Sequence, residues 1–285
     1  MAKIKQYDKL TEQLNIETYF DYFNRLSLIA QSIFKYENLP NFINEKWIEK
    51  YLFEFGSCVF FNDRNLGFIV TKFNNVGNLN NYDEPTQIRP FGTNYTTDEN
   101  LINNENCVII RNNALSIPTV NTVNLYAIRL TEISRTIDVN INAQKTPVLI
   151  KCSDKQKLVL KNAYKQWDGN SPVIFADKSL DMATFNVLKT DAPIVFDKLQ
   201  IQKNMLWNEI MTVLGINNAN MDKKERLVDD EVRANNEQVE ICADVMLKSR
   251  ELAVEQINNL FGLNIKVTKR TQNKANTGEL EGVIE

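Results

Sequence analysis

The segment from Asp191 to Gly215 constrains the fold most, because it carries apolar residues on two sides of one helix. Pro193 near its start and Gly215 at its end are typical helix boundaries. One face carries Val195, Leu199, Leu206, Ile210 and Val213. The other carries Ile194, Ile201, Met205 and Leu214. A helix that covers a single core needs only one apolar stripe, so we expect this helix to have two packing partners.

Hydrophobic periodicity elsewhere predicts an α+β chain that is mainly helical. Apolar residues recur every three or four positions in four further segments, at about 16–34, 44–55, 120–142 and 237–261. The second of these segments is followed by Gly56, the expected stop.

β-rich runs predict a hairpin between the second and third helices. Cys58 to Asn62 and Leu66 to Phe73 are separated by Asp63, Arg64 and Asn65. We expect further strands at Cys107 to Ile110 and at Leu263 to Val267. Residues 74 to 105 are polar and are expected to form a long exposed loop.

The segment 146–190 predicts a small α/β insertion between two long helices. Its expected elements are a helix from Ser153 to Trp167 and strands at 147–151, 172–175 and 185–188. Residues 216–236 are polar with charges of both signs, which predicts a mobile loop. The tail from Thr271 is expected to be disordered.

Composition excludes several classes of enzyme. The 285 residues include no histidine, which removes Ser-His-Asp and Cys-His catalysis and histidine-ligated zinc. The chain has no P-loop motif, and Cys58, Cys107, Cys152 and Cys242 form no CxxC pair, so we interpret them as reduced core residues. We predict no cofactor, no bound metal and no enzymatic activity.

Charge and hydropathy exclude two further classes. A net charge of −3 argues against a protein that coats nucleic acid by bulk charge. The first residues lack the apolar region of a signal peptide, and no run of about 18 apolar residues occurs. We expect a chain that is neither secreted nor membrane-spanning.

One acidic cluster offers an alternative function. Asp229, Asp230 and Glu231, with Lys223 or Lys224 nearby, could serve a metal-dependent nuclease. The interleaved charges of this run favour a solvated loop instead. A monomeric helical DNA-binding module is a further alternative.

The three tryptophans are candidates for stacking on nucleic-acid bases. Each sits in an apolar helical pattern, which favours core packing or subunit contact. They are Trp47, Trp167 and Trp207.

Several ordered runs carry a resemblance to a known family. They are ENLP (37–40), NAQKTPVLI (142–150), SPVIFA (171–176), KTDAP (189–193), QKNMLWNEIMTVLGINNAN (202–220), KKER (223–226) and LKSRE (247–251). With them the chain resembles the portal protein, also called connector or upper collar protein, of small short-tailed phages with protein-primed DNA replication. The resemblance covers about residues 16 to 270.

The resemblance implies a homododecameric ring at one capsid vertex, through which double-stranded DNA is packaged and ejected. Its implied partners are the capsid protein, a packaging ATPase, and the lower collar and tail proteins. The implied parts are an N-terminal arm with the first part of the wing (1–117), stem helix 1 (118–145), a clip (146–190), stem helix 2 (191–215), a tunnel loop (216–236) and the second part of the wing (237–270), followed by the tail (271–285). The ring would be assembled in the bacterial host cytoplasm.

The resemblance also implies roles for particular residues. Lys189 and Lys198 match lysines that project into the DNA channel, where Asp197 and Glu209 would moderate their attraction for DNA. The tunnel loop, at about 218–235, contributes the basic residues Lys223, Lys224, Arg226 and Arg233.

Two basic segments complete the expectations. The helix expected in the clip offers Lys155, Lys157, Lys161 and Lys165 to the motor or the tail. Some family members contact a packaging RNA through an arginine-rich N-terminus, but this chain has only Lys3, Lys5 and Lys9 there. The sequence therefore leaves open whether a packaging RNA is a partner.

Overall fold

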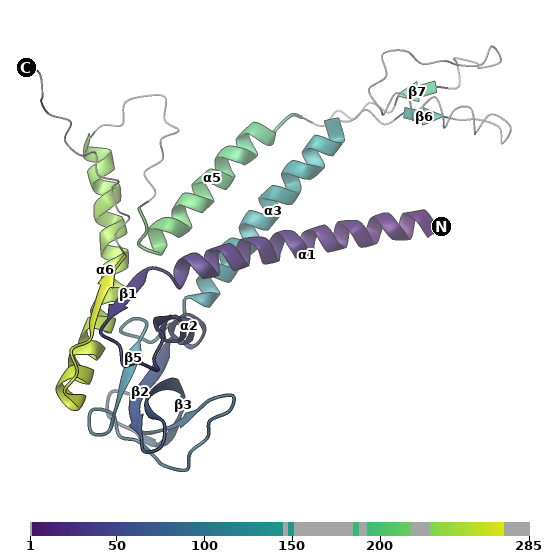
Figure 1. The fold of residues 1–285 in the computed structure, drawn as a ribbon. Helices are drawn as coiled ribbons and strands as arrows, with labels where there is room; N and C mark the ends of the chain where they lie inside the picture. The colour runs from purple at the N-terminus through teal and green to yellow at the C-terminus, as the bar shows by residue number, and fades with distance from the viewer. Residues whose placement is uncertain (1, 145–147, 151–184, 188–192, 218–228, 271–285) are drawn as a thin grey trace, which may run out of the picture. The chain divides into compact units, whose positions relative to one another are not determined.

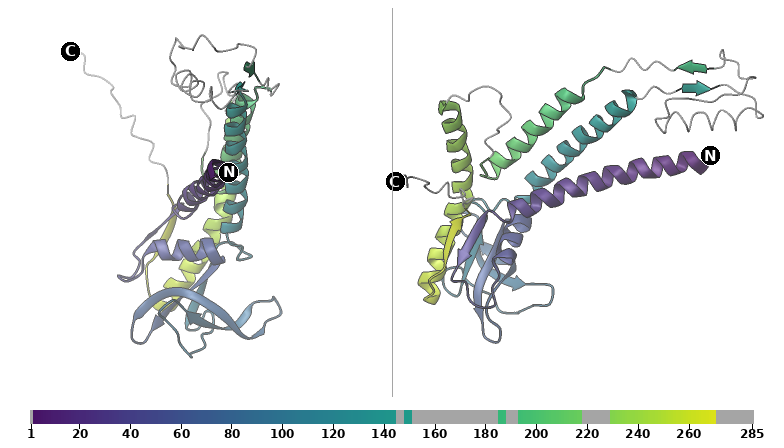
Figure 2. Two further views of the ribbon diagram at one scale, coloured as in Figure 1. Left: turned by 90° about the vertical axis from the view of Figure 1, so that its right-hand side faces the viewer. Right: turned by 45° about the horizontal axis from the view of Figure 1, so that its top comes forward.

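The computed structural model describes residues 2–144, 148–150, 185–187, 193–217 and 229–270 (Figure 1). The chain divides into two compact units. The first contains Met1–Thr131 with Asn204–Glu285, and the second contains Glu132–Lys203. Two long helices, α3 and α5, pass from one unit to the other (Figure 2).

Long helices dominate the described residues, as the sequence predicts. They are α1 (Ala2–Ala30), α2 (Glu45–Phe55), α3 (Val120–Gln144), α5 (Phe196–Val213) and α6 (Asp229–Phe261). The predictions for α2 and α3 are confirmed to within about two residues. The Asn44 side chain caps α2 by accepting a hydrogen bond from the Lys46 N–H, and Gly56 ends it at a φ of 76°.

Helices α1, α5 and α6 have boundaries that differ from the prediction. Helix α1 starts at Ala2 and ends at Ala30, and Phe34 opens strand β1 (Phe34–Glu37) instead of closing the helix. Helix α5 starts at Phe196, because the Asn140 amide holds the preceding segment outside the helix. Its Nδ2 donates to the Pro193 carbonyl at 2.9 Å, and its Oδ1 accepts from the Val195 N–H at 3.2 Å.

Helix α6 starts at Asp229, well before the predicted Glu237. Its first residues are Asp229, Asp230 and Glu231, and carboxylates are favourable at the positive end of a helix dipole. The prediction that the loop extends to residue 236 is therefore wrong at its C-terminal end.

A four-stranded antiparallel sheet follows α2, with strand order β4-β3-β2-β5. Its strands are β2 (Ser57–Asp63), β3 (Gly67–Leu79), β4 (Pro85–Phe91) and β5 (Cys107–Arg111). The predicted β2–β3 hairpin is confirmed, with Val59 opposite Thr71 and Asp63 opposite Gly67. The prediction of a loop over residues 74–105 is wrong, because β3 continues to Leu79 and pairs with β4.

The central strands of this sheet are buried on both faces. Phe60 and Val108 contact a large core formed with the helices, whereas Val59 and Ile109 contact a smaller core on the opposite face. Burial on two faces explains why β2 and β5 are continuous apolar runs rather than alternating ones. Cys58 and Cys107 are free and fully buried here, as predicted, and Cys242 is half-buried.

A second, two-stranded sheet pairs β1 with β8 (Lys266–Lys269), far apart in the sequence. Phe34 lies opposite Lys269, and Glu37 lies opposite Lys266. In the second unit, β6 (Val148–Ile150) pairs with β7 (Phe185–Val187) in the predicted insertion. The rest of that insertion, including the predicted helix 153–167, lies outside the described residues.

Gly215 allows α5 to end directly against α6. Its φ is 70°, and a Cβ there would lie 2.6 Å from the Ala243 Cβ and 2.7 Å from the Ala243 backbone. Only glycine fits both the conformation and this close approach. Across the described ranges, no helix is sufficiently long and apolar to cross a membrane.

Candidate subunit interface and channel residues

Helix α5 has the two apolar sides that its sequence predicts. Ile210, Met211 and Leu214 are buried in the core of their own chain. On the opposite side, Ile201 is 59% exposed and Met205 is 57% exposed. Two residues differ from prediction, because Leu214 is buried and Val213 is 41% exposed.

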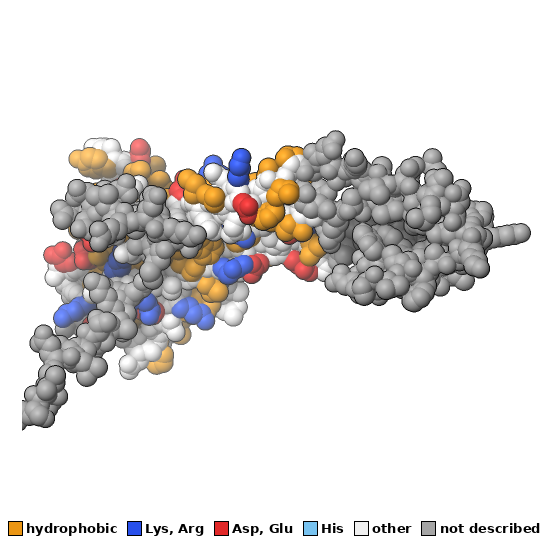
Figure 3. Space-filling model, turned by 90° about the horizontal axis from the view of Figure 1, so that it is seen from above, with side chains coloured by type: hydrophobic (Ala, Val, Ile, Leu, Met, Phe, Trp, Pro, Cys, Tyr) orange, Lys and Arg blue, Asp and Glu red, His pale blue; other side chains and the backbone are white. Residues whose placement is uncertain are grey.

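The other long helices also leave large apolar side chains uncovered. These are Ile16 and Phe20 on α1, Leu125, Ile128 and Val139 on α3, and Ile241, Val245 and Leu252 on α6. Figure 3 shows such hydrophobic side chains interspersed with charged ones on one face of the described chain. Large apolar side chains left exposed in this number on several helices are typical of chains that bury them against another subunit.

A partly buried hydrogen bond connects α3 to α5 within the first unit. The Tyr126 hydroxyl donates to the Glu209 carboxylate at 2.7 Å. Burial, and then the bond to Glu209, raise the pKa of Tyr126 to about 12, so the hydroxyl keeps its proton at neutral pH. Glu209 is therefore engaged in joining two helices, a role that the sequence does not predict.

Of the two predicted channel lysines, Lys198 lies in the described part and Lys189 lies outside it. Lys198 is exposed, and it shares the outer side of α5 with Ile201 and Met205 at helical spacing. Asp197 is exposed directly beside it. The outer side of α5 therefore combines apolar side chains with one lysine.

Most of the other predicted site residues lie outside the described part of the chain. Lys223, Lys224 and Arg226 lie outside the described residues. The clip lysines Lys155, Lys157, Lys161 and Lys165 also lie outside them. Arg233 lies on α6 rather than on a loop.

The acidic cluster proposed for a nuclease occupies the first turn of α6. Asp229, Asp230 and Glu231 therefore stand at the end of the helix where its dipole favours negative charge. Among the described residues no three Asp, Glu or Cys side chains are grouped closely enough to hold a metal ion.

Two tryptophans are described, and they differ in environment. Trp207 is partly buried against the core. Trp47 is 43% exposed, with the ammonium groups of Lys46 and Lys50 each 5.1 Å from its ring centroid. Trp167 lies outside the described residues.

A buried ion pair that the sequence does not predict holds α6 to α2. Arg250 on α6 and Glu49 on α2 have side chains 2% and 3% exposed. Arg250 donates from Nε to Oε1 of Glu49 at 2.9 Å and from Nη2 to Oε2 at 2.8 Å. This two-bond geometry is the strongest form of an arginine–carboxylate contact.

The remaining donors and acceptors of this pair are also satisfied. Arg250 Nη1 donates to the carbonyls of Asn112 and Met246, each at 3.0 Å, and Nη2 donates to the Asn112 side chain at 3.1 Å. The Tyr36 hydroxyl donates to Glu49 at 2.9 Å, and the Phe34 ring lies 4.2 Å from the guanidinium carbon. Arg250 lies in the LKSRE run, the one signal in the sequence that could have directed attention to it.

The fold is that of a chain in the portal and tail of native bacteriophage P68. That chain is 16% identical, with a TM-score of 0.53, over 95% of this chain and 92% of that one. A HK97-family phage portal protein from Corynebacterium diphtheriae matches with 12% identity and a TM-score of 0.44 over 90% and 93% of the two chains. A chain of a native gene transfer agent virion matches with 9% identity and a TM-score of 0.49 over 93% and 84%.

The chain therefore has the fold of a portal chain, with long helices whose apolar sides are partly uncovered. More specifically, the family model described as Phage Connector (GP10) matches residues 2–274, so the chain belongs to the phage connector family. It is a portal protein of a phage virion, and its family is structural rather than enzymatic.

Proposed function

We propose that twelve copies of the chain form a ring at one capsid vertex, with a central channel for packaging and ejecting double-stranded DNA. The ring would assemble in the host cytoplasm. It would contact the capsid protein, the packaging ATPase, and later the lower collar and tail proteins. Membership of the connector family supports this proposal.

The single observation on which the proposed ring rests is the second apolar side of α5. A cyclic assembly joins two different surfaces of each chain, so every subunit needs one surface for each neighbour. Ile201 and Met205 on α5 offer one such surface, and Leu125 and Ile128 on α3 offer the other. We assign α3 and α5 to the stem on this basis.

The channel lysines fit a conduit through which DNA slides. A 25-residue helix such as α3 is about 38 Å long, and duplex DNA of that length carries about 22 phosphate charges. Lys189 and Lys198 in twelve copies would supply about 24 positive charges. Asp197 reduces the net charge of each Lys198 ring, so that DNA is attracted without being held in place.

We assign the clip to residues 146–190 and the tunnel loop to the segment between α5 and α6. The clip lysines would contact the motor during packaging and the tail afterwards. The loop lysines would resist the backward movement of packaged DNA. Deleting residues 154–168 should therefore impair packaging or tail attachment and leave the ring intact.

Mass measurement of the purified protein tests the ring. Wild-type protein should have about twelve times the 32.9 kDa mass of one chain. Met205→Glu should shift the population to smaller species, because it places a charge in an apolar contact. Leu66→Glu is the matched control, since Leu66 is also 56% exposed but lies in the β2–β3 turn.

A wild-type protein that remained a 32.9 kDa monomer at micromolar concentration would overturn the ring. If Met205→Glu and Leu66→Glu both left the ring intact, the assigned interface would be wrong, but the ring itself would not be contradicted.

A further inference from the structure

In the two-stranded sheet β1–β8, part of the outer edge of β8 is not covered by any of the described residues. The Arg270 N–H donates to the Ile33 carbonyl at 2.8 Å, which fixes the alternation of hydrogen bonds along the pair. Residues 266 and 268 therefore direct their backbone groups at β1. Ile265, Val267 and Lys269 direct theirs away from it.

Side chains occupy some of the outward backbone positions of this sheet. Asn258 on α6 donates to the Ile265 carbonyl and accepts from its N–H, both at 2.8 Å, as a neighbouring strand would. On the far edge, the Tyr36 N–H donates to the Glu45 carboxylate at 3.1 Å. Among the described residues, no such partner is found for the outward N–H and C=O of Val267.

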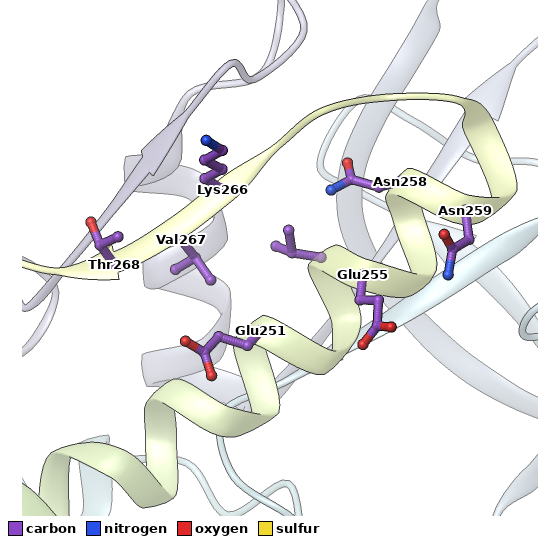
Figure 4. A pocket seen from close by; sticks show the side chains of 8 residues that line it. Glu251, Glu255, Asn258, Asn259, Lys266, Val267 and Thr268 are labelled. Carbon is purple, nitrogen blue, oxygen red and sulfur yellow. The ribbon is translucent and has the colours of Figure 1, made fainter.

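An open groove of about 430 Å³ runs beside this edge, between β8 and α6. Figure 4 shows Val267 directed toward α6, with Lys266 on the opposite side of the strand. The groove is lined by Val254 and Val267, both buried, and by the exposed carboxylates of Glu251 and Glu255.

The groove has an uncompensated negative charge. Within the described part of the chain, neither Glu251 nor Glu255 forms an ion pair. Lys266, the one cation among the residues that line the groove, lies opposite Glu37 on β1 and is directed to the other side of the strand from Val267 (Figure 4). A ligand of this groove should therefore bring positive charge of its own.

We propose that the groove binds an extended, basic segment of a partner protein, which adds to β8 as a third strand. Its backbone pairs with Val267 and Lys269, as in other cases of strand addition. Alternate side chains face α6, where apolar ones contact Val254 and lysine or arginine reaches Glu251 and Glu255. The two carboxylates give the site its preference for basic sequences.

The test uses the assembled full-length protein and a fluorescent probe peptide of alternating lysine and valine. Anisotropy should show saturable binding of this peptide and none of its glutamate–valine counterpart. Glu251→Gln combined with Glu255→Gln should weaken binding about 10-fold. Glu237→Gln combined with Glu240→Gln, also exposed on α6 but outside the groove, should leave it unchanged.

A backbone variant separates strand addition from simple charge attraction. Lys269→Pro removes an outward N–H and keeps the ladder to β1, so it should abolish binding, whereas Lys269→Ala should not. Melting curves check that both variants remain folded. Equal binding by both would overturn strand addition.

Two further outcomes would overturn the proposal. One is absence of binding to the wild-type ring, or equal loss with the control pair of glutamines. The other is much tighter binding by a chain that ends at Arg270, since this would identify residues 271–285 as the natural occupant.

Discussion

Breaking the buried pair of Arg250 and Glu49 should destabilise the protein more than any surface substitution. Arg250→Met leaves the Glu49 carboxylate buried, with the Tyr36 hydroxyl as the one remaining donor among those described above. Removing one partner of a buried ion pair typically costs about 3–5 kcal/mol. We expect a loss of this size in the free energy of unfolding, and a similar loss for Glu49→Gln.

The double variant tests whether the pair acts as a unit. With Arg250→Met and Glu49→Gln together, no charge is buried, and the glutamine still accepts from Tyr36. The combined loss should therefore be smaller than the sum of the single losses by about 2–3 kcal/mol. Urea denaturation followed by tryptophan fluorescence, at one fixed protein concentration, measures all three.

A matched surface pair provides the control. Lys248 and Asp244 lie 4.0 Å apart on the same helix, with side chains 77% and 55% exposed. Lys248→Met should cost less than about 1 kcal/mol. If Arg250→Met cost no more than Lys248→Met, or if the two single losses simply added, the argument from burial and hydrogen bonding would be refuted.

Three other predictions follow from the described geometry. Gly215→Ala should lower the free energy of unfolding by about 2–4 kcal/mol, because of backbone strain and the contact with Ala243. Gly262→Ala, with a φ of 67° and open space around it, should cost about 1 kcal/mol. Equal losses in denaturation would contradict this prediction. In a Cys152→Ser background, a thiol reagent should modify Cys242 first. Burial raises the pKa of the Cys107 thiol to about 12 and also raises the pKa of the Cys58 thiol. Rapid labelling of all three cysteines would contradict this prediction. Lys198→Ala should reduce the salt dependence of DNA binding to the ring, and Lys248→Ala should not; an unchanged slope in a salt titration would remove Lys198 from the channel.

The sequence predicts those elements whose local pattern agrees with their surroundings. Helix α2 has a capping asparagine, a single apolar face and a terminal glycine, and its bounds are correct within a residue. The two apolar sides of α5 were also predictable, because uncovered apolar residues keep the helical period even when no partner is present.

The misplaced elements depend on contacts that no local pattern records. Strand β3 continues through Asn74 and Asn75 because β4 pairs with it, although asparagine disfavours strands. Asn140 delays the start of α5 from the other long helix. Arg250 and Glu49 lie 201 positions apart, so their pairing follows only from the packing of α6 on α2.

The early start of α6 limits what a tunnel loop can do. Eleven residues separate Asn217 from Asp229, and a chain of that length extends at most about 37 Å. A loop that leaves at Asn217 and returns at Asp229 therefore reaches no more than about 18 Å from these two residues, against about 30 Å for the predicted span of 218–235. Lys223 and Lys224 lie at its midpoint and would be carried farthest, whereas Arg233 stays on the helix. If this loop binds DNA, the contact must be made by Lys223, Lys224 and Arg226. These residues can reach DNA only where the ends of α5 and α6 lie close to the channel axis.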